Sequence, residues 1–555
     1  MREREERFTS PARNWVRWMQ RIGAGDRVTY VTLGSAALVR WMVALGGYSG
    51  QADAPMHGDY EAQRHWMELT LHLPPTKWYF YDLPYWGLDY PPITAYVSWV
   101  CGWIGSQINK DWFALEKSRG YESDSSRVFM RATVLALDLA IYVPCIVLFC
   151  RRWFAYRSRR TQELATITLL LQPALILIDH GHFQYNNVML GLSLYAILCF
   201  REGKDLLGAA AFVCSMTFKQ MALYYAPAVF GYLLGKCFWL GWREGRTLFL
   251  GLAVVSTLTL LSTLIPFLPP FAPFPETLLQ VVHRIFPVAR GLFEDKVSNF
   301  WCASDPIIHW RRRLSNEMLV RFSGIGTVGA AALPMLHLLR VSWGAGGRQQ
   351  RNVASPALRL LPWAMFNSAM AFFLFSFQVH EKSILLPLMP LTLLLGDRGS
   401  EADDGDDTWE WGVLVNNMGV LTMWPLLSKD GQALNYFVLP LFWNYLIGYN
   451  PLRLSSGWFL RFLTLVCAVP CTYAMTHADP VQSSYTLIAI LHIMEATVPP
   501  PQRYPDLWVV ARVAVGCGVF GLAWLWGLRK QLEVGWGIGT FHAAPAPPRL
   551  QSKTK

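Results

Sequence analysis

Long apolar stretches recur along all of this 555-residue chain, and they constrain the fold more than any other feature. A membrane-spanning helix needs roughly 17–25 mostly apolar residues, and fourteen stretches reach or approach that length. The sequence therefore predicts an all-α polytopic membrane protein with about fourteen transmembrane helices. The predicted spans are residues 29–48, 131–150, 162–178, 188–200, 206–218, 221–235, 247–267, 318–339, 360–378, 383–396, 411–427, 433–449, 457–475 and 507–527.

The composition agrees with a membrane protein. Charged residues make up 16% and hydrophobic residues 53% of the chain, whereas soluble domains have about 25% charged residues. This balance excludes a disordered, collagenous or disulfide-framework protein. The net charge of +11 is typical of a membrane protein whose cytoplasmic segments are rich in Lys and Arg. We therefore expect no nucleic-acid partner.

The distribution of Lys and Arg orients the predicted spans. Five arginines cluster within residues 151–160, and the positive-inside rule places this segment and the N-terminus in the cytoplasm. We expect the C-terminus on the same side. The predicted segments are a cytoplasmic N-terminal segment (1–28), a first transmembrane module (29–267) that includes a large loop with interfacial helices (49–127), a second long loop (268–317), a C-terminal transmembrane module (318–527) and a disordered cytoplasmic tail (528–555).

An acidic motif follows the first span, in the run GDYEAQRHWMELT. Asp59 and Glu61 are two residues apart, so in an extended chain both side chains face one cavity. Such carboxylates can remove a proton from a sugar hydroxyl or hold a divalent cation against a phosphate. They can equally be solvated loop acids, and spacing alone does not decide among the three. The stretch 61–73 is also compatible with an amphipathic helix at the membrane interface.

An aromatic run at residues 78–92 has two interpretations. Seven aromatic residues and two acids lie within these fifteen positions. Aromatic rings with acids between them can form a sugar-binding platform. An aromatic belt at the membrane interface has the same composition, and the two interpretations are equally compatible with the sequence.

Ionisable residues inside or between spans are costly to place and so indicate a purpose. The turn 378–382 (QVHEK) is either an anchoring polar turn or a substrate contact. The run 179–182 (DHGH) lacks the further ligands that a zinc site needs. This favours a role in substrate binding or in structural hydrogen bonds over a metal site. Arg40 and Asp138 either pair within the bundle or line a cavity for a lipid phosphate.

Five runs of the sequence together resemble a known enzyme family: GDYEAQRHWMELT, KWYFYDLPYWGLDYPPITAY, HGHFQYNNVMLG, RIFPVARGLFEDKVSNFWC and FSFQVHEKSILLPLMPL. They resemble the endoplasmic-reticulum glucosyltransferases that build the lipid-linked oligosaccharide for N-glycosylation. Within this family the runs are most similar to the members that add the first glucose. The siblings that add the second glucose share the LDYPP run but are less similar at residues 61–68, and they are the alternative.

The resemblance implies a glycosyltransferase C type fold in the endoplasmic-reticulum membrane, with the active site facing the lumen. It implies dolichyl phosphate glucose as donor and a high-mannose oligosaccharide on dolichyl diphosphate as acceptor, with membrane lipid around the protein. The family's acidic motif falls on Asp59-Tyr60-Glu61, so Asp59 is the implied catalytic base with Glu61 as a second catalytic residue, and Asp89 matches a further family acid. The substrate-binding residues expected around them are Arg64, His65, Asp89, Tyr90, His182, Gln184, Lys219, Arg284, His380, Glu381 and Lys382.

The chemistry of this transfer agrees with a carboxylate base. A β-linked phosphate donor that gives an α product requires inversion, and inversion requires a base on the acceptor hydroxyl. The phosphate leaves as an anion and requires cations or hydrogen-bond donors rather than a strong acid. Lys219, Arg284, His380 and Lys382 are the cationic candidates. We expect no cofactor and no metal ligands, although a divalent metal at Glu61 is left as an alternative. A polytopic transporter is the alternative from a different class, although transporters concentrate their polar groups near the membrane midplane.

Overall fold

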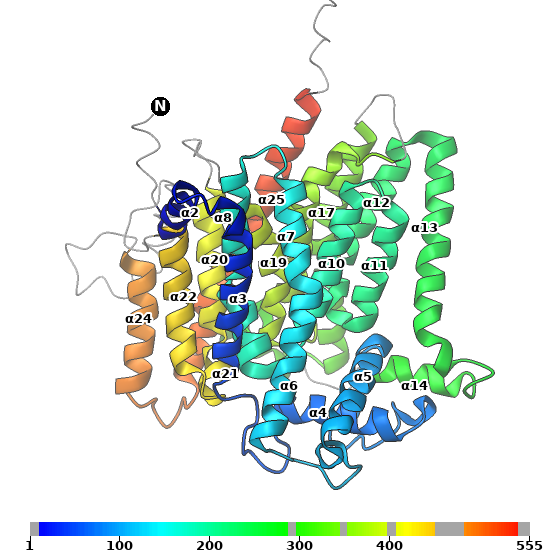
Figure 1. The fold of residues 1–555 in the computed structure, drawn as a ribbon, viewed down its shortest axis with the longest axis vertical. Coiled ribbons are helices and arrows are strands. Elements are labelled where there is room, and N and C mark those ends of the chain that lie inside the picture. Colours follow the sequence, from blue (N-terminus) through cyan, green and yellow to red (C-terminus); the bar gives the residue numbers. More distant parts are fainter. Residues whose placement is uncertain (1–9, 287–295, 345–351, 397–406, 450–481, 542–555) are drawn as a thin grey trace, which may run out of the picture.

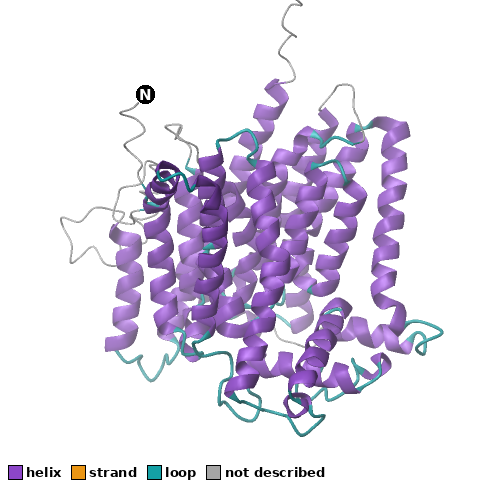
Figure 2. Cartoon of the chain, in the orientation of Figure 1, coloured by secondary structure: helices purple, strands orange, loops and turns teal. Residues whose placement is uncertain are grey.

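The computed structural model describes residues 10–286, 296–344, 352–396, 407–449 and 482–541. This described part is helical and contains no strand (Figure 2). Most helices run side by side in one bundle, and α4 and α14 lie across one end of it (Figure 1). That end, called here the α4 end, carries the polar residues that the sequence singles out.

Six helical stretches of the described part are long and apolar enough to cross a membrane. They confirm an all-α membrane protein but not the predicted count of fourteen spans. Two shorter apolar helices, Asp205–Phe218 and Ala433–Ile447, match predicted spans at 206–218 and 433–449. The predicted span 457–475 lies outside the described residues. The six long stretches are Asp124–Trp153, Arg159–Phe183, Gly241–Phe267, Asn316–Trp343, Pro356–Phe375 and Leu507–Ile538.

The helices follow one another with short connections. In the first half they are α2 (Pro11–Arg21), η1 (Gly25–Arg27), α3 (Val28–Ala44), α4 (Gly58–His72), η2 (Pro75–Lys77), α5 (Pro92–Ile108), η3 (Lys110–Phe113), α6 (Asp124–Leu137), η4 (Asp138–Tyr142), α7 (Val143–Trp153), α8 (Arg159–Leu170), α9 (Pro173–Leu175), η5 (Ile176–Phe183), α10 (Asn186–Arg201), α11 (Asp205–Phe218), η6 (Gln220–Tyr225), α12 (Ala226–Trp239) and α13 (Gly241–Leu264). The second half comprises η7 (Ile265–Phe267), α14 (Glu276–Ile285), α15 (Phe300–Ile308), α16 (Trp310–Arg313), α17 (Asn316–Gly344), η8 (Pro356–Leu360), α18 (Leu361–Phe375), η9 (Glu381–Ile384), α19 (Leu385–Leu395), α20 (Thr408–Thr422), α21 (Trp424–Lys429), α22 (Ala433–Ile447), α24 (Gln482–Thr497) and α25 (Leu507–Phe541).

Two short segments of π-helix interrupt the bundle helices. Residues 138–142 (η4) separate α6 from α7, and residues 176–183 (η5) continue from α9. Single-turn widenings of this kind are rare and often occur at functional sites. Here η5 carries the predicted residues Asp179, His180 and His182, and every residue of η5 is buried.

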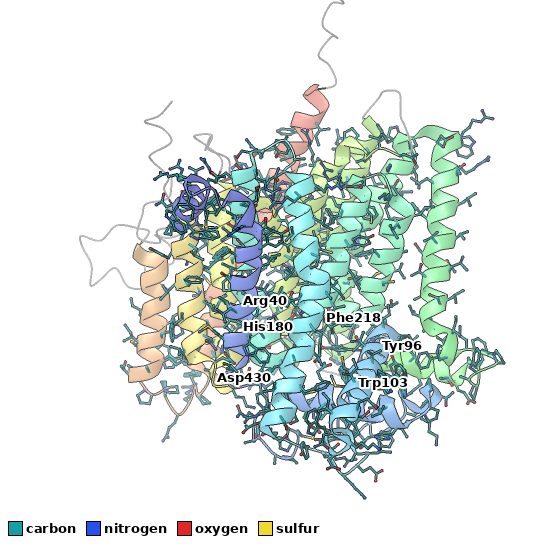
Figure 3. All side chains as sticks on the ribbon, viewed as in Figure 1. Arg40, Tyr96, Trp103, His180, Phe218 and Asp430 are labelled. Carbon is teal, nitrogen blue, oxygen red and sulfur yellow. The ribbon has the colours of Figure 1, made fainter. Side chains whose placement is uncertain are left out.

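The sequence placed Arg40 and Asp138 near the middle of the first two spans, and the structure confirms that they pair. Arg40 Nε donates to Asp138 Oδ2 at 2.6 Å, and His180 Nε2 lies 2.9 Å from the same oxygen. All three side chains are at most 2% exposed. Figure 3 shows Arg40 and His180 inside the bundle, with Asp430 nearer the α4 end. Buried ions are tolerated when they are paired in this way.

Two predictions about individual segments differ from the structure. The stretch 61–73 is not an interfacial helix with one exposed face, because residues 60–70 of α4 are buried on all sides. The charged residues of α4 satisfy one another, so that loops can cover them without leaving an unpaired ion. At the C-terminus, α25 extends to Phe541, well into the segment predicted as a disordered tail from residue 528, and residues beyond 541 lie outside the described part.

Candidate active site

Asp59 lies in the first turn of α4, where two loops approach each other closely. Gly58 begins the helix with φ +64°, and a Cβ there would meet Ser49 Oγ at 2.7 Å, so glycine suits both the conformation and the contact. The backbone amide of Asp59 donates to Ser49 Oγ at 3.0 Å. Ser49 in turn donates its own amide to the carbonyl of His182 at 3.1 Å. This close approach fixes the Asp59 backbone beside η5.

Three side chains from distant parts of the sequence converge on one oxygen of Asp59. Gln184 Nε2 donates to Asp59 Oδ2 at 2.5 Å, and His182 Nε2 lies 2.9 Å from it. Lys382, from η9, donates to the same atom. The bonded residues are 123 to 323 positions away from Asp59 in the chain.

The second oxygen of Asp59 is left for another partner. No hydrogen bond recorded for the described residues uses Oδ1, and the side chain is 23% exposed, whereas His182 is 2% exposed. Burial on its own raises the pKa of Asp59, but the Lys382 ammonium and then His182 outweigh burial and hold this pKa well below the usual carboxyl range. Asp59 is therefore an ionised, partly open carboxylate at neutral pH.

His182 also reaches a second carboxylate, on its other side. Its Nδ1 lies 2.5 Å from Oδ2 of Asp430, which directly follows α21. Arg131 of α6 holds the preceding backbone by donating to the carbonyls of His180 and Gly181 at 2.5 and 2.9 Å. The imidazole is thus fixed between two acids by contacts from four separate segments.

A buried polar chain extends from Asp59 toward the bundle interior. Lys219 Nζ donates to Oε1 of Gln184 at 2.8 Å and to Oδ1 of Asn186 at 2.7 Å. The amide of Asn186 then donates to Asp179 Oδ1 at 2.8 Å. Because each polar group finds a partner, this chain can remain ordered beneath the open carboxylate.

Lys219 also lies near the aromatic run. Its ammonium is 4.8 Å from the ring centroid of Tyr90, within the range of a cation–π contact. The charge of Asp89 acts on Lys219, as do those of Asp59 and Lys382. Asp59, Asp89, Lys219 and Lys382 thus form one group of alternating charges at the α4 end.

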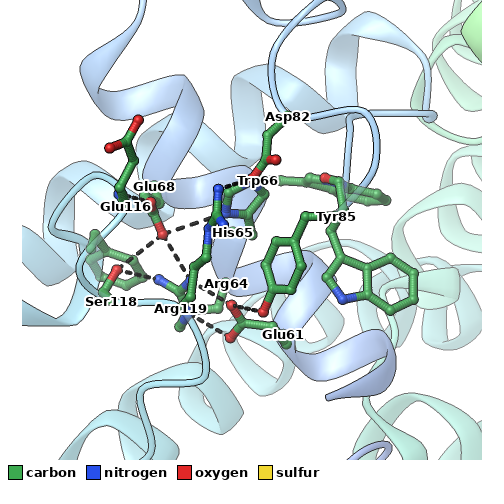
Figure 4. Close-up of polar contacts among 12 residues, drawn as sticks. Glu61, Arg64, His65, Trp66, Glu68, Asp82, Tyr85, Glu116, Ser118 and Arg119 are labelled. Atoms are coloured by element: carbon green, nitrogen blue, oxygen red, sulfur yellow. Dashed lines mark hydrogen bonds and ion pairs between the residues drawn. The ribbon is translucent and has the colours of Figure 1, made fainter. Parts of the chain in front are cut away.

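A different polar cluster occupies the middle of α4 (Figure 4). Arg64 donates through Nε and Nη2 to the two oxygens of Glu61, at 2.7 and 2.6 Å, and through Nη2 to Glu68 at 2.8 Å. Its Nη1 donates to Ser118 Oγ at 2.6 Å, and Tyr85 donates its hydroxyl to Glu61 at 2.9 Å. The side chains of Glu61, Arg64 and Glu68 are at most 2% exposed.

His65 and Glu68 extend this cluster toward Asp82 and Glu116. Burial raises the pKa of Glu68, but contacts with His65, Arg64 and the backbone amide of Glu116 lower that pKa to about 2. His65 is fully buried, with Nε2 at 3.4 Å from Asp82. Glu68 therefore stays ionised throughout the physiological pH range as part of a closed network.

The first residues of the aromatic run pack into a small hydrophobic core, and the sugar-platform interpretation stays a prediction for the remaining aromatic residues. Trp78 and Tyr79 are at most 4% exposed and pack with Trp66 of α4 and with Phe267. Arg284 of α14 ties this segment down by donating to the carbonyls of Leu88 and Gly87, at 3.1 and 2.8 Å, and other contacts of Arg284 exist as well. Tyr90, at the end of the run, is half-buried and faces Lys219.

Comparisons with known proteins identify the family. A model of the ALG6, ALG8 glycosyltransferase family matches residues 36–526, which is most of the chain.

The chain belongs to this family.

Several relatives in the family are similar over nearly their whole length. The chain is 39% identical over 554 residues to the dolichyl pyrophosphate Man9GlcNAc2 alpha-1,3-glucosyltransferase of Saccharomyces cerevisiae, with 95% of both chains covered. It is 40% identical over 510 residues to the protein of that name from Gallus gallus, with 88% of this chain and 93% of the relative covered. A probable enzyme of that name from Schizosaccharomyces pombe is 41% identical over 512 residues, with coverage of 91% and 92%. The chain is therefore a membrane glycosyltransferase.

The structure brings together only part of the predicted site. Asp59, His182, Gln184, Lys219 and Lys382 form one connected group, with Asp89 and Tyr90 beside Lys219. The remaining predicted residues lie elsewhere. Glu61, Arg64 and His65 belong to the closed α4 cluster, Arg284 donates to loop carbonyls, and His380 and Glu381 directly precede Lys382 in the chain.

The extended-chain hypothesis for Asp59 and Glu61 is not what the structure shows. Because both residues lie on the helix α4, successive side chains turn by about 100°, and the two carboxylates point to different partners. The predicted catalytic role of Glu61 and the predicted binding roles of Arg64 and His65 stay predictions. Among the residues described, no group of three or more His, Cys, Asp or Glu side chains is arranged to hold a metal ion.

Sequence reasoning missed two residues of the site. Asp430 contacts His182, and Ser49 contacts the Asp59 backbone. Asp430 stands in a short polar turn between two predicted spans, as His380 and Lys382 do, so the same argument from intramembrane cost would have selected it. Ser49 carries no comparable signal, because a serine after a span is an ordinary loop residue.

Proposed function

We propose that this chain transfers glucose from dolichyl phosphate glucose, in α-1,3 linkage, to the Man9GlcNAc2 oligosaccharide carried by dolichyl pyrophosphate. This is the first glucose added in the N-glycosylation pathway. The proposal rests on relatives that carry this name at 39–41% identity over most of the chain. It places the protein in the endoplasmic-reticulum membrane with the α4 end facing the lumen and both termini in the cytoplasm.

One observation carries the chemistry: Asp59 has one oxygen held by three donors and the other oxygen without a described partner. A carboxylate held in this way is ionised, aimed and accessible, which are the requirements of a general base. The neighbouring Lys382 supplies positive charge of the kind that a leaving phosphate requires. A solvated loop acid would be ionised and accessible, but three donors would not hold one of its oxygens in a fixed direction.

The reaction is a single inverting displacement. The 3-hydroxyl oxygen of the terminal mannose attacks C1 of the donor glucose, and the bond from C1 to the phosphate oxygen breaks. The proton of the hydroxyl passes to Asp59 Oδ1, and the bonding electron pair leaves with dolichyl phosphate. His380 and Arg284 are proposed to assist at the phosphate, together with Lys382. No covalent glucosyl-enzyme intermediate forms, since one inversion converts the β-linked donor into an α product.

The decisive experiment measures glucosyl transfer by the purified protein in detergent. Dolichyl phosphate glucose is offered with a Man9GlcNAc2 lipid-linked acceptor and, in parallel, with an acceptor that already carries one glucose. Transfer to the first acceptor alone supports the proposal. Transfer to the second alone moves the protein to the sibling role, and transfer to neither, with folded protein and intact donor, reopens the transporter hypothesis.

We propose that the transfer requires no divalent metal, because protein ammonium groups can neutralise the phosphate. Transfer measured after treatment with a chelator should equal transfer without it. Activity that is lost in chelator and restored by magnesium or manganese would contradict this part of the proposal.

A further inference from the structure

His182 stands between two carboxylates that come from opposite halves of the chain. Nε2 is 2.9 Å from Asp59 Oδ2, and Nδ1 is 2.5 Å from Asp430 Oδ2. Asp430 lies directly after α21, 248 positions beyond His182, and its side chain is 3% exposed. Burial of this kind excludes Asp430 from contact with a sugar or a phosphate, so any effect on the reaction must pass through His182.

The two contacts together determine the proton content of the imidazole. A carboxylate accepts hydrogen bonds, and an imidazole nitrogen can donate only when it carries a proton. Because both ring nitrogens face carboxylate oxygens, both contacts are hydrogen bonds only if both nitrogens are protonated. The ring is then an imidazolium with a carboxylate at either end, which is the arrangement that leaves no buried charge unpaired.

We propose that Asp430 is a positioning residue which, through His182, holds Asp59 in place and keeps it ionised. This inference rests on the proposed function, since it assigns Asp59 as the base. Asp430 fixes the second proton on His182, and the charged ring then donates to the oxygen of Asp59 that faces away from substrate. The base thereby depends on a residue of the C-terminal module.

Other charged groups face the same ring and were weighed. The Lys382 ammonium lies 3.3 Å from His182 Nε2, and because an ammonium can only donate, this contact is a hydrogen bond only when Nε2 carries no proton. It therefore competes with the contact from Nε2 to Asp59 and opposes a second positive charge on the ring. Arg131 of α6 is close enough to Asp430 for their charges to interact. Two carboxylates in direct contact outnumber the one ammonium in direct contact, so the balance around the ring favours the imidazolium.

The test compares pH profiles of glucosyl transfer for wild type, Asp430→Asn, His182→Gln and the double variant. Asp430→Asn should lower kcat about 10- to 100-fold, as is usual when an orienting partner is removed. The acid limb of kcat/KM should move to higher pH by roughly one unit, because Asp59 loses a positive neighbour. His182→Gln should move the limb in the same direction. The double variant should be no less active than His182→Gln alone, since Asp430 acts only through the ring.

Two further variants make the test specific. Asp430→Glu keeps a carboxylate, so its acid limb should stay at the wild-type position even if kcat falls. Asp53→Asn removes an exposed acid that pairs with Lys429, next to Asp430, and should leave rate and profile unchanged. If Asp430→Asn cannot be purified as a folded protein, the acid limb of His182→Gln decides in its place.

Each outcome has a distinct meaning. An unmoved acid limb in Asp430→Asn, or losses that multiply in the double variant, would overturn the inference while leaving the proposed function intact. A wild-type protein that transfers no glucose would instead remove the proposed function. Separate donor-binding measurements on each variant show whether a lost rate comes from the base or from a lost substrate.

Discussion

Two charged clusters share the helix α4, and they are built in opposite ways. The Glu61–Arg64–Glu68 cluster is formed by residues three and four apart on one helix, is closed to solvent, and has hydrogen bonds on every side of its guanidinium (Figure 4). The Asp59 cluster gathers residues 123 to 323 positions away and leaves one carboxylate oxygen partly open.

This difference suggests that one cluster serves the stability of the fold and the other serves the reaction. A buried network of local ion pairs loses much if one member is removed, because the remaining charges stay buried without partners. A partly exposed carboxylate can lose its charge at a smaller cost to the fold, since water can replace part of the lost contact. We therefore expect the first cluster to control folding and the second to control turnover, and four substitutions test this expectation.

Asp59→Asn should have the largest effect on turnover. The amide keeps the size of the side chain but cannot accept the proton of the acceptor hydroxyl, so kcat should fall about 10²- to 10⁴-fold, as for loss of a general base. The thermal unfolding midpoint and donor binding should change little. Glucosyl transfer within a few-fold of wild type would remove Asp59 from the role of base.

Arg64→Met should have the largest effect on stability. It leaves Glu61 and Glu68 buried without their counter-ion, which costs about 3–5 kcal/mol. The measurement is the thermal unfolding midpoint of the protein in detergent. Arg321→Met is the matched control, because Arg321 forms an i,i+4 pair with Glu317 in which both side chains are more than 70% exposed. Equal midpoints for the two variants would contradict the assignment of the Arg64 cluster to folding.

Lys382→Met should shift the pH dependence of the reaction. Asp59 acts only when ionised, and its depressed pKa preserves activity at acid pH until the pH falls through that value. Removal of the ammonium should raise the pKa of Asp59 and move the acid limb of kcat/KM upward by roughly 1–3 pH units. Lys429→Met, at an exposed lysine paired with Asp53, should leave the limb in place. A limb that moves equally in both variants would point to a general surface-charge effect.

Tyr85→Phe should have the smallest effect. It removes only the hydrogen bond from the Tyr85 hydroxyl to Glu61, and Glu61 keeps both bonds from Arg64. The expected loss is about 1 kcal/mol of stability, with glucosyl transfer nearly unchanged. A large loss of transfer with an unchanged unfolding midpoint would bring Tyr85 and Glu61 back into the catalytic group.

Local pattern was enough to predict much of the fold. The predicted spans at 247–267 and 318–339 lie within helical segments of the structure, because a long apolar run has few alternatives to a helix in a membrane. The predicted span at 360–378 contains α18 (Leu361–Phe375) and extends three residues beyond its end. The short apolar run 206–218 also forms a helix, Asp205–Phe218, which is shorter than the six stretches that are long enough to cross a membrane. The apolar stretch 484–495, which is too short to span a membrane comfortably, lies within the helix α24 (Gln482–Thr497).

The site was harder to predict because its contacts are not local. Asp59, His182 and Lys382 were selected by resemblance, and no rule of spacing links residues so far apart. Asp430 was missed although its polar turn between two predicted spans carries the same signal as residues 378–382. Glu61 was grouped with Asp59 because the sequence does not show that a helix begins at Gly58, and that helix start turns the two carboxylates toward different neighbours.

The distance in sequence between Asp59 and its ammonium partner also has a consequence for synthesis. Lys382 follows Asp59 by 323 positions, which a ribosome covers in roughly a quarter of a minute to one minute at about 5–20 residues per second. During that interval the growing chain carries Asp59 without its counter-charge, even if its early helices are already inserted. With Asp59 in the proposed role of base, a nascent or prematurely terminated chain has the helices of an enzyme without a working base. The proposed activity then requires that the C-terminal helices have entered the membrane.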